Sequence, residues 1–132
     1  MIEYKTLKLD EDTDKDILTT AFEGGIGYWA CLGNDDKHWI EQCKLHKERT
    51  GEAPYYCDTA LNVMLNGHAV ILYDEEDDDK KLKMYLDDFM KGCYLFTQEY
   101  GSITRKLNRG DFDAIDADMI IQYAVFGEVI YG

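Results

Sequence analysis

Residues 69–89 read AVILYDEEDDDKKLKMYLDDF, and this stretch decides the fold class. An apolar, β-prone run over 69–73 is followed by charged residues and then by an alternating run over 82–86. Two such runs around a charged segment are typical of an antiparallel hairpin with a charged tip. Asp87 and Asp88 would complement the N-terminal partial charge of a following helix. The expected core face of that helix is Leu86, Phe89, Met90, Cys93 and Phe96.

Helices are predicted on both sides of this hairpin. Thr13 lies three residues before Asp16, the spacing of a capping box, and an apolar stripe follows it until Gly24 and Gly25. Asp58 is a good N-cap for a short helix that Asn66 and Gly67 would end. The residues that this short helix would bury are Ala60, Leu61, Met64 and Leu65.

The C-terminal segment predicts a central helix. It would begin near Asp113 or Asp116, is apolar nearly all round, and would end at Gly127. A closing strand over 128–132 and an edge strand over 2–9 are also expected. Residues 26–32 fit either a buried strand or a helical continuation, 33–56 have the character of variable loops, and 102–110 are expected to form a basic connector. The whole chain, 1–132, is therefore predicted to be one α+β domain, a small antiparallel sheet with its central hairpin over about 69–86, packed by three to four helices.

Charge is the most unusual property of the composition. The chain has 27 acidic and 14 basic residues, a formal net charge of −13. Such a molecule repels nucleic acid and attracts basic surfaces, which disfavours direct DNA or RNA binding. No run approaches the roughly 18 apolar residues of a membrane span, and residues 1–5 lack the start of a signal peptide. We therefore expect a cytoplasmic protein, with reduced cysteines and no membrane partner.

The segment over 23–29, EGGIGYW, is the richest in candidate site residues. Gly24 and Gly25 would allow a backbone to approach a ligand closely, while Glu23, Tyr28 and Trp29 could orient it. The structural alternative is a helix end with its aromatic rings packed in the core.

Near the other end of the chain, Gln122 lies in an apolar helix and needs a hydrogen-bond partner if it is buried. If Glu23 lies beside Gln122 and Glu128, these residues would frame a polar pocket. The alternative is that Gln122 is bonded to backbone.

Motifs for catalysis or metal binding give no positive signature. EGGIGYW is not followed by the Gly-Lys-Ser/Thr of a phosphate loop, and no nucleophile elbow surrounds Ser102. Cys43, His46 and Cys57 are residue types that bind zinc, but their spacing is irregular, so a metal site there stays open. We expect no catalytic residue and no cofactor, which favours a binding protein over an enzyme.

Acidic residues gather in three clusters, over 10–16, 74–79 and 111–118. Duplex DNA presents one charge per about 1.7 Å of axis, so clusters on one side of a fold could imitate DNA to a basic groove. The alternative is solubility and helix capping, since two of the clusters lie at helix starts. The candidate partner-binding residues are Asp74, Glu75, Glu76, Asp77, Asp78, Asp79, Asp111 and Asp113.

EGGIGYW over 23–29 and DADMIIQYAVFGEVIYG over 116–132 together resemble a group of small proteins encoded by bacteriophages, plasmids and integrated mobile elements. That group has an early EGG-x-x-YW block and a C-terminal Q-x-A-x-FGE-x-x-YG block. The resemblance implies a mobile-element origin and lends no catalytic residue.

Small acidic proteins of such elements often block host defences. The first hypothesis is therefore an inhibitor of the anti-CRISPR or anti-restriction type, which occupies the basic nucleic-acid-binding groove of a host protein or nucleoprotein complex. The alternative is a small-molecule-binding protein or enzyme. Its pocket would be framed by Glu23, Gly24, Gly25, Tyr28, Trp29, Gln122 and Glu128.

Overall fold

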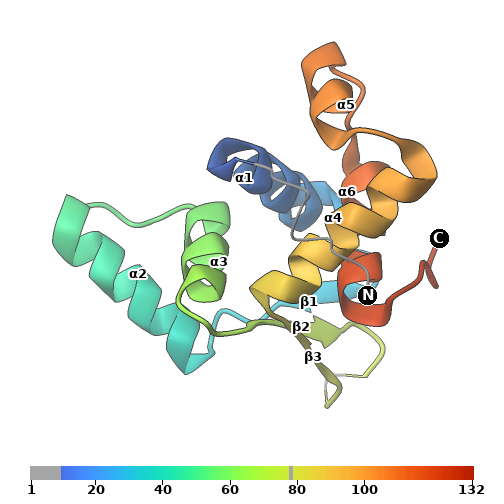
Figure 1. Ribbon diagram of the computed structural model, residues 1–132. Coiled ribbons are helices and arrows are strands. Elements are labelled where there is room, and N and C mark those ends of the chain that lie inside the picture. The colour runs from blue at the N-terminus through green and yellow to red at the C-terminus, as the bar shows by residue number, and fades with distance from the viewer. Residues whose placement is uncertain (1–9, 78) are drawn as a thin grey trace.

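The computed structural model describes residues 10–77 and 79–132. It contains a three-stranded antiparallel sheet with helices packed against it (Figure 1). The elements are α1 (Glu11–Thr20), the π-helical turn η2 (Ala21–Gly25), β1 (Ala30–Leu32), α2 (Lys37–Thr50), α3 (Tyr56–Leu65), β2 (Val70–Asp74), β3 (Lys81–Met84), α4 (Leu86–Tyr100), α5 (Ile103–Arg109) and α6 (Ala114–Phe126). The α+β class is confirmed. The strand expected over 2–9 lies outside the described residues.

The hairpin predicted over 69–86 is confirmed as β2 and β3. Val70 pairs with Met84 and Tyr73 with Lys81, while β1 pairs antiparallel with the other edge of β2. β2 is therefore the central strand, and Val70 and Leu72 are almost completely buried. Residues 26–29 form a turn that leads from η2 into the short strand β1, which resolves the ambiguity of that segment.

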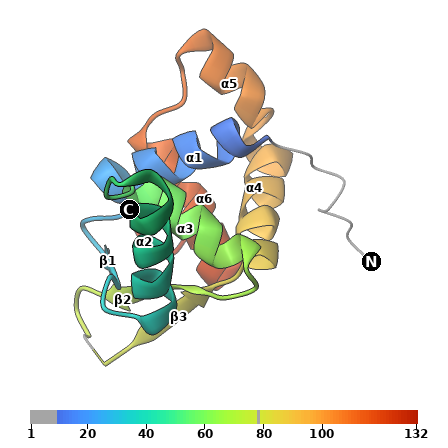
Figure 2. The same ribbon diagram turned by 90° about the vertical axis from the view of Figure 1, so that its left-hand side faces the viewer.

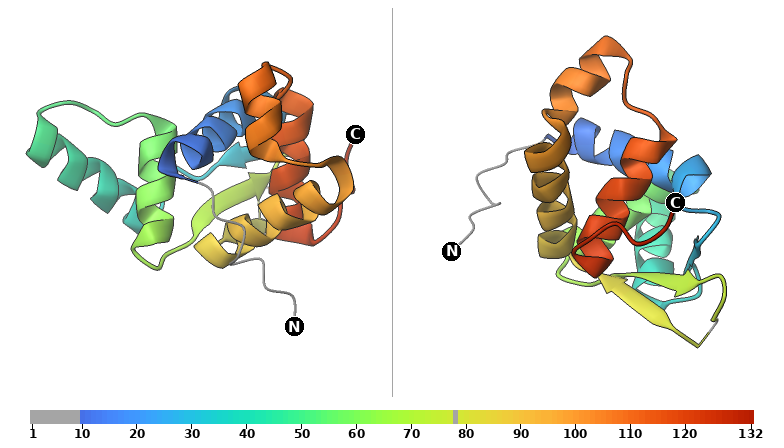
Figure 3. Two further views of the ribbon diagram at one scale, coloured as in Figure 1. Left: turned by 45° about the horizontal axis from the view of Figure 1, so that its top comes forward. Right: turned by 90° about the vertical axis from the view of Figure 1, so that its right-hand side faces the viewer.

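The predicted central helix is also confirmed, as α6. Ile120 and Ile121 are completely buried, and α6 packs along α4 (Figure 3). Asp113 caps its N-terminus by accepting a hydrogen bond from the backbone of Asp116. Gly127 ends it in the left-handed conformation, with φ of 78°, which glycine adopts without the steric cost of a Cβ.

Two segments that were not expected to be helical are helices. Asp36 accepts a hydrogen bond from the backbone of His38 at the start of α2, and Ser102 caps α5 in the same way. With these two, six α-helices rather than three to four are found among the described residues. Helix α2 escaped prediction because it is mostly polar and buries only Trp39, so its sequence lacks the apolar stripe of a core helix.

Several boundaries also differ from the expectations. Asp10, not Thr13, caps α1, because its carboxylate accepts a hydrogen bond from the backbone of Thr13 at 2.7 Å. Helix α3 begins before Asp58, and the expected core residue Leu65 is 51% exposed. No strand forms over 128–132; this tail is held by a side chain of α6 instead.

Helices α2 and α3 form a pair that stands beside the rest of the molecule (Figures 1 and 2). Helix α3 packs against α1, and α2 is the outer member of the pair. Side chains of α2 and of β1 line a shared hollow. None of the helices in the described ranges is long and apolar enough to cross a membrane.

Candidate functional site

The EGGIGYW segment forms η2 and the turn that precedes β1, and it packs against the first turn of α6. A Cβ on Gly25 would lie 2.9 Å from the carbonyl oxygen of Ala114 and 3.3 Å from the backbone nitrogen of Asp118. Glycine is therefore required at this position, because a side chain would push the segment off α6. The close backbone approach expected at Gly25 occurs, and its partner is a helix of the same chain.

Asp118 is the centre of a buried polar network that joins the EGGIGYW segment to α6. Its carboxylate accepts hydrogen bonds from the Tyr28 hydroxyl at 2.6 Å, from Trp29 Nε1 at 2.7 Å and from Gln122 Nε2 at 3.0 Å. Burial, and then the bond to Asp118, raise the pKa of Tyr28 to about 12, as expected for a phenol that donates to a carboxylate. The network thereby anchors the turn that precedes β1.

Gln122 extends this network to the C-terminal tail. Its Oε1 accepts hydrogen bonds from the backbone nitrogens of Ile130 and Tyr131, both at 2.8 Å. The Tyr131 ring stacks on Trp29 at a centroid distance of 5.3 Å, and its hydroxyl donates to Asp74 at 3.2 Å. Gln122 is therefore bonded both to backbone and to Asp118, and the bonds satisfy its buried amide.

Only part of the predicted pocket comes together. Gly24, Gly25 and Tyr28 line a hollow of about 430 Å³, together with Asp118 and Tyr131. The remaining predicted residues are placed differently: Trp29 and Gln122 are buried, and Glu23 and Glu128 are exposed and do not line the hollow. Asp118 was not among the predicted pocket residues, although it lies four residues before Gln122 and therefore on the same helix face.

A larger cleft lies on the other side of the EGGIGYW turn, with a volume of about 730 Å³. We call it the α2 cleft. Phe22 of η2 lines it, the turn contributes Ile26 and Gly27, and β1 contributes its whole length, 30–32. The opposite walls come from α2, with Trp39, Cys43, Lys44 and Lys47, and from the α2–α3 connection and α3, with Ala53, Pro54, Tyr56 and Thr59. The sequence gives no sign of this cleft, because residues 37–50 lack the apolar stripe that would predict α2.

Of the three residues with metal-binding side chains, Cys43 and His46 contact other residues, and Cys57 is a half-buried free thiol. Cys43 Sγ lies 3.6 Å from Thr59 Oγ1, and His46 Nδ1 lies 3.5 Å from a guanidinium nitrogen of Arg49. Within the described ranges, no group of three or more His, Cys, Asp or Glu side chains is placed to hold a metal ion.

At the β2–β3 turn, the acidic cluster divides into a buried and an exposed part. Asp74 is 4% exposed and accepts hydrogen bonds from the Glu76 backbone and from the Tyr131 hydroxyl. Its carboxylate therefore shapes the turn rather than facing solvent. The exposed carboxylates are those of Glu75, Glu76, Asp77 and Asp79, and Asp78 lies outside the described residues.

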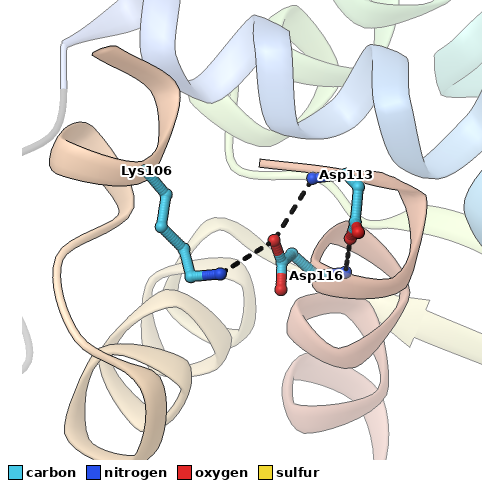
Figure 4. Close-up of polar contacts among 3 residues, drawn as sticks. All are labelled: Lys106, Asp113 and Asp116. Atoms are coloured by element: carbon cyan, nitrogen blue, oxygen red, sulfur yellow. Dashed lines mark hydrogen bonds and ion pairs between the residues drawn. The ribbon is translucent and has the colours of Figure 1, made fainter. Parts of the chain in front are cut away.

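The C-terminal acidic cluster is largely engaged within the fold. Asp116 is buried and accepts from Lys106 Nζ and from the Asp113 backbone, each at 3.2 Å (Figure 4). Asp118 belongs to the network described above, which leaves Asp111 and Asp113 exposed. The loop that contains Asp111 and Asp113 lies at the opposite end of the molecule from the β2–β3 turn (Figures 1 and 3). These two clusters therefore do not adjoin on one surface.

The first acidic cluster lies at the start of α1. Asp10 is the N-cap, and its hydrogen bonds to Thr13 lower its pKa. Burial, followed by the nearby charges of Asp10 and Glu11, raises the pKa of Asp14 to about 7. Asp14 therefore carries only part of a negative charge at neutral pH.

Comparison with family models, with curated proteins and with solved structures found no match to this chain.

Proposed function

We propose that this protein binds a small molecule in the α2 cleft. The observation that carries the proposal is the cleft itself, a hollow of about 730 Å³ with apolar walls and a few polar side chains. Binding sites for small molecules are typically concave, mostly apolar and about 300–1,000 Å³ in volume. The hollow beside Tyr28, at about 430 Å³, also falls in this range, and the α2 cleft is the larger of the two.

The polar network supports the proposal by giving the α2 cleft a firm wall. Tyr28 and Trp29 are bonded to Asp118, and Ile26 and Gly27 directly precede them in the turn that lines the cleft. A wall held by buried hydrogen bonds loses little freedom when a ligand binds, which favours affinity. In this proposal the EGGIGYW segment supports one wall of the ligand site. Glu23, Tyr28 and Trp29 do not contact the ligand, because they do not line the α2 cleft.

Two glycine substitutions test which hollow binds. Gly27 lines the α2 cleft, does not have a positive φ, and has no heavy atom within 4 Å of a Cβ built on it. A Cβ at this position therefore points into open space, and we expect a leucine side chain there to obstruct the cleft. We expect Gly27→Leu to abolish the stabilisation by compounds that a thermal-shift screen finds; for the wild type, a ligand at 100 times its Kd adds about 2.7 kcal/mol.

Gly24→Leu is the matched control, because Gly24 lines the smaller hollow and a Cβ there would lie 4.0 Å from Ala114 Cβ. This variant should retain the thermal shift. If Gly24→Leu removes the shift and Gly27→Leu does not, the smaller hollow is the site and the α2 cleft is not. The proposal would also be contradicted if no compound in a broad metabolite screen raises the melting temperature of the wild type or of either variant.

As a second candidate function, we propose inhibition of a basic host-defence protein or nucleoprotein complex. The observation that favours it is the outward-facing acidic turn of Glu75, Glu76, Asp77 and Asp79 on a molecule with a net charge of −13. Occupying a basic groove would exclude nucleic acid, and electrostatic steering would speed the encounter. The proposal is confined to this turn, because the loop of Asp111 and Asp113 lies at the other end of the molecule.

Charge reversal tests this second candidate. The triple variant Glu76→Lys, Asp77→Lys and Asp79→Lys should bind a captured partner at least about tenfold more weakly, as measured by competition with DNA. High salt should weaken binding of the wild type in the same way. The control makes the same charge change in α1, at the exposed residues Glu11, Asp12 and Asp16. An equal loss in both triple variants would indicate a general charge effect, and no loss in either would end the role of the turn.

A further inference from the structure

We infer that the ligand of the α2 cleft is an organic anion with an apolar body, and that Lys44 and Lys47 hold its acidic group. The inference rests on the proposed function, since it assumes that the α2 cleft is the ligand site. It specifies the chemical class that the cleft selects.

The charge of the lining differs from that of the rest of the molecule. The cleft is lined by two lysines, Lys44 and Lys47, and by one carboxylate, Glu75. Two positive charges and one negative charge leave a lining of +1 on a chain of −13. Because the molecule as a whole repels anions, this local excess of positive charge does not attract an anion from a distance. It favours an anion only by direct contact inside the cleft.

The two lysines are also available for a ligand. The ion pairs found among the described residues join Lys15 to Asp58 and Lys106 to Asp116. Lys44 and Lys47 take part in neither of them, and both are exposed. Among the residues that the structure describes, neither Lys44 nor Lys47 has a carboxylate partner that it would have to give up to bind an anion.

Apolar and charged groups are separated along α2. Trp39, Cys43 and Lys47 follow one another at intervals of four residues, so they share one side of the helix. Trp39 is buried and faces the cleft near the start of α2, whereas Lys44 and Lys47 belong to its second half. A ligand would therefore place its apolar body near Trp39 and its acidic group near the two lysines.

A purely structural role explains this arrangement less completely. Lys47 lies in the last turn of α2, where a cation complements the partial negative charge of the helix C-terminus. That effect does not require the side chain to line a cavity, and it does not extend to Lys44, which lies one turn earlier. The presence of both lysines on the cleft wall is what the anion proposal explains.

Three probes of equal chain length and different charge test the inference: octanoate, 1-octanol and octylamine. Binding would be followed by the fluorescence of Trp39, with Trp39→Phe identifying that signal. Octanoate should bind about tenfold more tightly than 1-octanol, as expected for charge-assisted contacts, and octylamine should not bind in the cleft. Gly27→Leu should abolish the octanoate signal.

The double variant Lys44→Gln and Lys47→Gln should lose about tenfold in octanoate affinity while retaining 1-octanol binding. Lys37→Gln with Arg49→Gln is the matched control, since both residues are exposed on α2, do not line the cleft, and change the charge equally. This control should bind octanoate as the wild type does. Equal losses in the two double variants would overturn the role of Lys44 and Lys47.

The remaining outcomes separate this inference from the proposed function. If 1-octanol binds as tightly as octanoate, and Gly27→Leu blocks both, the anion class is wrong and the cleft remains the site. The same holds if octanoate does not bind but other compounds bind in a way that Gly27→Leu blocks. If no compound is sensitive to Gly27→Leu, the proposed function and the inference are both refuted.

Discussion

Asp118→Ala should lower the free energy of unfolding by about 3 kcal/mol, the cost expected when charge-assisted hydrogen bonds are lost and a buried donor is left unpaired. The substitution removes the acceptor of Trp29 Nε1, which lies inside the protein. Tyr28 is half-exposed and can donate to water instead, while Gln122 Nε2 retains the carbonyl of Tyr131. Most of the loss should therefore come from Trp29. Urea unfolding monitored by circular dichroism measures it as a shift of the midpoint at constant slope.

Two further substitutions calibrate this result. Tyr28→Phe removes the bond to Asp118 and the long bond from Gln122 Nε2 at 3.5 Å, both at an exposed ring, and should cost only about 1 kcal/mol. Asp118→Asn retains an acceptor oxygen for Trp29 and should lie between the other two variants. A loss below about 1 kcal/mol for Asp118→Ala would mean that aromatic packing, rather than the polar network, holds the EGGIGYW turn.

Gly92→Ala should be destabilising by about 3 kcal/mol, at the upper end of the usual range for overpacking a core. A Cβ on Gly92 would lie 2.9 Å from Ala124 Cβ and 3.0 Å from Ala124 N, and it would meet the carbonyl oxygen of Ile120 still more closely. Two of these three atoms are backbone of α6 and cannot turn away. Helices α4 and α6 would have to move apart, which opens packing defects along the main helix pair of the core. Thermal and urea unfolding should both report the loss.

Gly24→Ala is the control for this prediction. Gly24 is exposed, lies in η2, and a Cβ there would make only an ordinary contact with Ala114. The alanine reduces the backbone freedom of the unfolded chain, so this variant should have an unchanged free energy of unfolding or one raised by up to about 1 kcal/mol. If Gly92→Ala is as stable as Gly24→Ala, α4 and α6 do not require the close approach seen in the structure.

The network and the α2 cleft are connected through the turn that they share. Trp29 is bonded to Asp118, and the neighbouring residues Ile26, Gly27 and Ala30 line the cleft. The motif residues at the two ends of the chain thus meet one another, and their meeting positions one wall of the proposed ligand site. This arrangement accounts for a segment rich in glycine and aromatic residues without giving those residues a catalytic role.

The sequence by itself determined the elements that local patterns specify. An apolar run over 69–73 and an alternating run over 82–86 flank a charged tip, and together they form the β2–β3 hairpin. Asp113 and Gly127 mark the two ends of α6, because a capping carboxylate and a left-handed glycine act through neighbouring residues alone. The apolar character of 117–126 was sufficient to place that helix in the core.

Tertiary structure decided what depends on residues far apart in the chain. Tyr28 and Trp29 donate to Asp118, which lies 90 and 89 residues further along the chain, so these bonds required the fold. Asp74, Asp116 and Asp118 look like surface acids in the sequence, yet they are buried where a partner compensates each carboxylate. The α2 cleft combines the EGGIGYW turn, β1 and a polar helix. A hollow between such elements has no local signature, because it exists only where surfaces from separate segments meet.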